Sequence, residues 1–169
     1  MSWFEQLRRR KDDRGLMAAL RCALVDSKKH RAWPALHRLG LDVDNRAAAV
    51  VAGLFATHPE ETNAGNLGAT CKAIERKRDS NTQKDADAKI TPIERRFQHL
   101  LAAERGEELH QRVIRVVLLA KAQGVPVNYT QLDKDLRFWN ERTRQAWAAA
   151  FWTPYLEGAP ELPQTEAAR

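Results

Sequence analysis

The sequence lacks the residue patterns on which most catalytic and metal-binding proteins depend. It has no HExxH, GxSxG or GxGxxG motif and no phosphate-binding GKS or GKT loop. None of its five histidines lies three or four residues from another histidine or from a cysteine, which is the spacing that metal ligands on one helix need. The sequence therefore predicts a non-enzymatic protein without a metal site or cofactor.

Cysteines and long apolar runs are also scarce. The only two cysteines, Cys22 and Cys71, form no CxxC pair and fall on the apolar sides of helical patterns, so we expect reduced thiols in the core. No apolar run approaches the roughly 20 residues that span a bilayer, and residues 1–5 do not begin a signal peptide. We expect a soluble cytoplasmic protein that does not contact a membrane.

Positive charge is what the sequence has in excess. The 28 lysines and arginines outnumber the 22 acidic residues, which gives a net charge of +6 and a pI near 9.6. A moderately basic chain of this kind favours nucleic acid or another acidic surface as its partner.

Apolar residues recur with a period close to 3.6 along most of the chain, and no segment has the pattern of a strand. This predicts an all-α protein made of two small helical bundles in series. Residues 79–89 contain no large apolar residue, so we interpret them as a linker or long loop between an N-terminal bundle (1–78) and a C-terminal bundle (90–154). Residues 155–169 are expected to form a disordered tail.

The best defined helix start lies at Thr91, followed by Pro92. Thr91 suits the N-cap position, and Glu94 three residues later predicts a capping box. Arg95 and Arg96 follow, and neither has an acidic residue four positions on. Unpaired arginines beside an apolar helix face suggest an anionic partner.

Basic side chains therefore supply the candidate binding residues, because arginine can donate two parallel hydrogen bonds to a phosphate. The candidates are Arg14, Arg21, Lys28, Lys29, Arg95, Arg96, Arg105, Arg112, Arg115, Lys121, Arg142 and Arg144. The alternative is that these residues form ordinary solvated faces. Tryptophans such as Trp33, Trp139 and Trp147 follow apolar stripes, so we expect them in the core and not as stacking platforms for bases.

Several blocks of the sequence, in this order and at this spacing, resemble CasB, the small subunit of the type I-E CRISPR surveillance complex (Cascade). The blocks are Thr91-x-x-Glu94-Arg95-Arg96-Phe97-x-x-Leu100-Leu101, then Arg105, Leu109 and Arg115, then Val127-Asn128-Tyr129-x-x-Leu132-x-x-Asp135-Leu136-x-x-Trp139, and finally Trp147-x-x-x-Phe151. Looser blocks precede them at Asp13-Arg14-Gly15, Trp33-Pro34-Ala35-Leu36 and Asn66-Leu67-Gly68-Ala69. The resemblance extends over about residues 3–152.

The resemblance implies a non-catalytic all-helical subunit present in two copies beside the repeating backbone subunit and the large subunit. It implies that the chain supports the duplex of crRNA and target DNA and stabilises the displaced DNA strand of the R-loop. The basic residues of the family carry over first to Arg95 and Arg96, then to Arg21, Arg105 and Arg115, while the other candidates rest on charge alone. Two alternatives stay open, a helical DNA-binding transcription regulator and a structural adaptor that binds only protein.

Overall fold

A computed structural model describes residues 1–81 and 90–153 of the chain, and all regular elements in these residues are helices. The prediction of an all-α protein is confirmed. The elements are α1 (Trp3–Arg9), α2 (Arg14–Arg21), η1 (Cys22–Leu24), η2 (Asp26–Ala32), α3 (Trp33–Arg38), α4 (Arg46–Thr57), α5 (Leu67–Asn81), α6 (Pro92–Ala102), α7 (Glu107–Gln123), α8 (Tyr129–Arg137) and α9 (Glu141–Trp152). The expected tail and most of the expected linker lie outside the described residues.

Helix ends follow the capping residues in the sequence. The side chains of Asn45 and Asn128 accept hydrogen bonds from the backbone N–H groups of Ala48 and Gln131, which starts α4 and α8. Gly124 ends α7 in the left-handed conformation, with φ of 65°, where glycine has no Cβ atom to clash.

The second helix is shorter than the sequence suggested. The spacing of Arg14, Arg21 and Lys28 predicts that all three lie on one helix face, but α2 ends at Arg21 and the chain continues in the short 3₁₀ helices η1 and η2. Because a 3₁₀ helix has three residues per turn, Lys28 does not continue that face.

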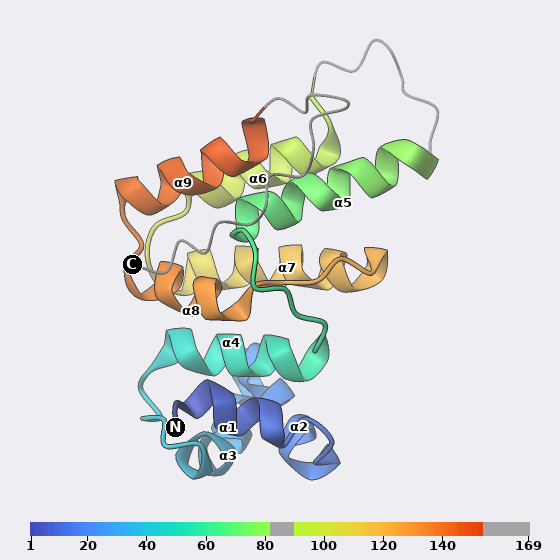
Figure 1. Ribbon diagram of the computed structural model, residues 1–169. Coiled ribbons are helices and arrows are strands. Elements are labelled where there is room, and N and C mark those ends of the chain that lie inside the picture. Colours follow the sequence, from blue (N-terminus) through green and yellow to red (C-terminus); the bar gives the residue numbers. More distant parts are fainter. Residues whose placement is uncertain (82–89, 154–169) are drawn as a thin grey trace.

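The helices stack in layers (Figure 1). Helices α1, α2 and α3 lie on one side of α4, whose residues from Ala48 to Ala56 are all buried. Helices α7 and α8 cover the other side of α4, and α5, α6 and α9 form the outer layer beyond α7. One continuous cluster of buried apolar residues runs through these layers.

Helix α5 packs with the C-terminal helices, although the expected boundary at 79–89 places it in the N-terminal bundle. Its contacts are with α9, α6 and α7, through buried residues such as Leu67, Cys71 and Ile74. Burial raises the pKa of the Cys71 thiol to about 12, which fits the expected core thiol, whereas Cys22 is only partly buried. The division into two domains stays a prediction, but the packing partners of α5 come from beyond the expected linker.

Two of the three tryptophans expected in the core are there. Trp147 is fully buried and Trp139 nearly so, with their rings 4.8 Å apart. The expectation is wrong for Trp33, which is 44% exposed, because it is the first residue of α3 and the residues that α3 buries are Ala35 and Leu36.

An ion pair connects α4 to α7. Arg46 donates to both carboxylate oxygens of Glu107, at 3.2 and 3.0 Å, and to the carbonyl oxygen of Ala23 at 2.6 Å. The hydrogen bond from Arg46 is the largest cause that lowers the pKa of Glu107 from 4.5 to about 2. Glu107 is half exposed, so solvent screening limits what the pair contributes to stability.

The lowered pKa of Glu107 predicts how stability changes in acid. A carboxyl whose pKa is depressed by folding stabilises the native state above its ordinary pKa, and this contribution is lost as the pH falls. We expect the free energy of unfolding, measured by urea titration, to decrease between about pH 4.5 and 2, and to decrease less in Glu107→Gln. Parallel pH profiles for the two proteins would contradict this role of the ion pair.

Candidate nucleic-acid interface

Helices α6 and α7 form a groove lined by cationic side chains. Its volume is about 560 Å³, and its lining residues are Arg96, His99, Arg112, Arg115, Val116, Leu118 and Leu119. Arg96 and His99 are three residues apart on α6, and Arg112 and Arg115 are three apart on α7, so each pair projects from one helix face. The groove thus brings together three of the arginines selected from the sequence.

The charges of this groove are largely uncompensated. No acidic residue lines it. Arg112 is held by Glu108, at 3.3 Å, within α7, whereas among the described residues Arg96 and Arg115 form no ion pair and both are exposed. Two free guanidinium groups on adjacent helices can therefore hydrogen-bond to an incoming anion, and Leu118, which is 44% exposed, offers it an apolar contact.

The start of α6 differs in one detail from the sequence prediction. The Thr91 hydroxyl accepts from the N–H of Glu94, as expected of an N-cap, and it donates to the carboxylate of Glu75 in α5. The other half of the capping box is absent, because the Glu94 carboxylate instead accepts from the indole N–H of Trp152 at 3.1 Å. These contacts fix α6 against α5 and α9. Arg95 is exposed but does not line the groove.

A second basic groove lies on the N-terminal helices. Its volume is about 560 Å³, and Lys11, Arg14 and Arg21 line it together with Asp12, Met17 and Ala18. The Nε of Arg21 donates to the carbonyl oxygen of Ala56 at 3.0 Å. Asp12 offsets part of the positive charge, so this groove is a weaker anion site than the one between α6 and α7.

The remaining candidates are dispersed, and several take part in internal contacts. Arg105 donates to the carbonyl oxygen of Arg137, and Arg144 donates to that of Ala103 while its guanidinium lies 5.4 Å from the centre of the Trp139 ring. Lys29 pairs with Asp26 at 2.9 Å. The other candidates outside both grooves, Lys28, Arg95, Lys121 and Arg142, are exposed.

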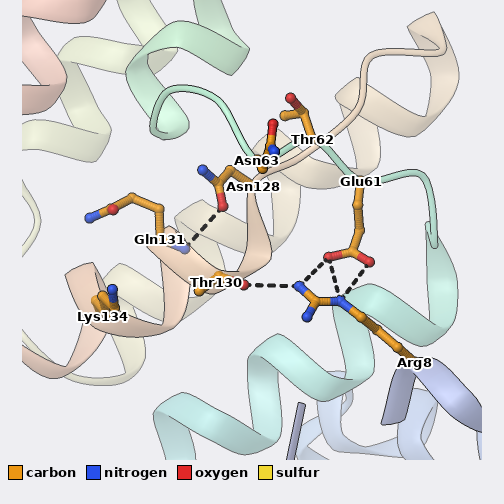
Figure 2. A pocket seen from close by; sticks show the side chains of 8 residues that line it. All are labelled: Arg8, Glu61, Thr62, Asn63, Asn128, Thr130, Gln131 and Lys134. Atoms are coloured by element: carbon orange, nitrogen blue, oxygen red, sulfur yellow. Dashed lines mark hydrogen bonds and ion pairs between the residues drawn. The ribbon is translucent and has the colours of Figure 1, made fainter. Parts of the chain in front are cut away.

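A polar pocket between α1, α8 and the segment before α5 also contains an arginine. Figure 2 shows Arg8 reaching to Glu61 and Thr130 at this site. Arg8 binds both carboxylate oxygens of Glu61, and its Nη2 lies 2.9 Å from the Thr130 hydroxyl. Because this guanidinium is already paired with a carboxylate, it joins parts of the chain and is not free for a phosphate.

Other kinds of site are not apparent in the part of the chain that the structure describes. Residues 1–81 and 90–153 contain no group of three or more His, Cys, Asp or Glu side chains able to hold a metal ion. Within the same residues, no helix has the length and hydropathy of a membrane span.

The structure differs from the sequence interpretation at two residues. His99 lines the α6–α7 groove one turn after Arg96, a neighbour that the i, i+3 spacing could have revealed. Trp33 was assigned to the core because it lies on the apolar stripe of a short helix. Such a stripe does not show which end of the helix is covered by other elements.

Comparison with known proteins gives a consistent result. The family model described as CRISPR-associated protein Cse2 matches residues 16–152. No curated protein matched the chain by sequence.

Solved structures show the same fold. A Cse2-family CRISPR-associated protein from Thermus thermophilus has 21% identity and a TM-score of 0.68, and the match covers 90% of this chain and 94% of that one. A structure of CasB, also from Thermus thermophilus, has 21% identity and a TM-score of 0.67, covering 91% and 100%. CasB from M. ruber has 25% identity and a TM-score of 0.58, covering 82% and 84%. Since the family model spans most of the sequence and these structures share its helical fold, the chain belongs to the Cse2 family of CRISPR-associated proteins.

Proposed function

We propose that the chain is the non-catalytic small subunit of a Cascade-type CRISPR complex and that it binds the sugar-phosphate backbone of nucleic acid. The observation that carries the proposal is the groove between α6 and α7, where Arg96, Arg112 and Arg115 meet, no acidic residue lines the groove, and only Arg112 is paired with a carboxylate. Membership of the Cse2 family supplies the CRISPR context.

The chemistry of the groove suits a phosphate backbone. Guanidinium groups donate paired hydrogen bonds to phosphate oxygens, and several together give an affinity that does not depend on sequence and that falls with salt. The groove presents no rigid set of amide or carboxylate groups that would read base edges. We therefore expect the groove to bind the strand through its backbone, whatever its base sequence.

Backbone binding of this kind is sufficient for a role in R-loop formation. Exchange of a DNA duplex for an RNA–DNA hybrid is nearly balanced in free energy, so modest contacts with the strands can shift the equilibrium. In this proposal the chain supports the duplex of crRNA and target DNA and retains the displaced strand, beside the repeating backbone subunit, the large subunit and a second copy of itself. Two copies would double the number of weak contacts on one nucleic acid.

The test is binding of the full chain to single-stranded and duplex DNA over a series of salt concentrations. We expect an affinity for both DNAs that decreases linearly with salt on logarithmic axes. A protein-only adaptor would show negligible affinity at every salt concentration, and a transcription regulator would prefer one duplex sequence. Either outcome would overturn the proposal, as would unchanged retention of target DNA by Cascade particles that lack the chain.

A further inference from the structure

We propose that Trp33 is a stacking platform for an unpaired base, and that Lys28 and Arg31 bind phosphates of the same strand. This inference rests on the proposed function and adds to it a site for an unpaired base on the N-terminal helices. The site is separate from the α6–α7 groove, because the residues concerned belong to η2 and α3.

The indole of Trp33 is free, unlike those of three other tryptophans. The N–H groups of Trp139, Trp147 and Trp152 donate to Ala103, Asp135 and Glu94. In the described residues nothing accepts a hydrogen bond from Trp33, and 44% of the residue is exposed. The ring of His30 stands nearly perpendicular to it, at 76° and with the centres 6.3 Å apart. Much of Trp33 is thus open to solvent, and an aromatic ring can stack on any base.

The sequence around Trp33 is basic between Asp26 and Asp42. Residues 27–41 contain no aspartate or glutamate, and their lysines and arginines are Lys28, Lys29, Arg31 and Arg38. Lys29 is paired with Asp26. Lys28, Arg31 and Arg38 are exposed and form no ion pair within residues 1–81 and 90–153. Proteins hold single strands by combining an aromatic ring with cations that follow the backbone, and the free cations Lys28 and Arg31 closely precede Trp33 in the chain.

A small hollow adjoins the ring. Its volume is about 160 Å³. Trp33, Leu36, Val43 and two alanines form its apolar lining, and Lys29, Asp44 and Arg46 line the rest. The face of a base is apolar, and such a hollow can cover part of it. A docked protein segment fits the surroundings less well, because the centres of protein interfaces are depleted of charged residues, whereas cations flank this indole in the sequence.

The experiment compares affinities of full-chain variants for a fluorescent single-stranded DNA at several salt concentrations. Trp33→Ala is expected to lower the affinity by about tenfold to a hundredfold at each salt concentration, because a stacked base is lost. The slope of affinity against salt should be unchanged, since no phosphate contact is removed. Trp33→Phe should retain most of the affinity, because it keeps an aromatic face.

Removing the cations, in contrast to removing Trp33, should change the salt slope. Lys28→Ala with Arg31→Ala removes two phosphate contacts, so the salt slope should fall by about 1.4 for a single strand. Arg9→Ala with Arg10→Ala is the matched control, because it removes two exposed cations at the end of α1 and should leave the Trp33-dependent affinity in place. Melting temperatures should stay near that of the parent chain, since all four cations and much of Trp33 are exposed.

The outcomes separate this inference from the proposed function. Trp33→Ala with parental affinity for single strands overturns the stacking site but leaves salt-dependent binding, and hence the proposed function, intact. Absence of DNA binding by the parent chain overturns both. Parental DNA affinity together with loss of Trp33→Ala from assembled Cascade particles would show that Trp33 contacts protein, which also overturns the stacking site.

Discussion

Replacement of Gly68 by alanine should destabilise the protein more than any other single methyl addition among its described glycines. A Cβ atom on Gly68 would lie 2.1 Å from the carbonyl oxygen of Trp147 and 2.8 Å from the carbonyl carbon. Both are backbone atoms of α9, so no side-chain rotation can relieve the clash. Helices α5 and α9 would have to move apart. This shift would also disturb the contacts of α5 with α6 and α7.

The expected cost is about 3 kcal/mol or more, the upper part of the range for overpacked cores. At about 2–4 °C per kcal/mol for a chain of this size, thermal unfolding followed by circular dichroism should show a decrease of roughly 10 °C. Gly15→Ala is the matched control, because a Cβ atom there meets only the Asp13 side chain at an ordinary 3.6 Å. That variant should be as stable as the parent or more so, since alanine favours helix.

A melting temperature of Gly68→Ala within a degree or two of the parent value would mean that α5 and α9 do not approach as closely as described.

Reversal of charge at Arg96 and Arg115 should abolish most of the nucleic-acid affinity of the α6–α7 groove. The change replaces two free guanidinium groups by carboxylates that repel phosphate, and we expect the affinity at low salt to fall by about a hundredfold. The salt slope should fall by about 1.4 for a single strand and about 1.8 for a duplex. Both residues are exposed, so the fold should persist.

The control variant carries the same change of net charge, made outside the groove. Arg9→Glu with Arg10→Glu alters two exposed residues at the end of α1, outside all described pockets. If affinity depends on the groove, only the Arg96 and Arg115 variant loses it, both as a full chain and within assembled Cascade. Equal losses in the two variants would show that overall charge matters and that the groove does not.

The fold was predictable from the sequence where local chemistry decides the structure. Asn45, Asn128 and Gly124 mark helix ends because a side-chain oxygen or a missing Cβ atom acts within a few residues. The packing partners of α5 were not predictable, because a buried stripe such as Leu67, Cys71 and Ile74 shows that a face is covered but not by which helix.

The same limit applies to the site. Charge and spacing predicted Arg96, Arg112 and Arg115, and the structure brings them into one groove. Arg105 and Arg144 look identical to them in a sequence, yet their guanidinium groups donate to backbone carbonyl oxygens of distant residues. Whether an arginine is available to a ligand depends on which backbone carbonyl groups lie beside its side chain. The tertiary fold sets this, and the local sequence does not.

The position of α5 has a consequence for synthesis of the chain. Asn66, just before α5, donates to the carbonyl oxygen of Ala146, which is 80 residues later. At about 5–20 residues per second, α5 leaves the ribosome roughly 4–16 s before α9 exists to cover it. During this interval the part of α5 that packs on α9 remains open to water or to chaperones, so nascent chains truncated before α9 should be the species most prone to aggregation.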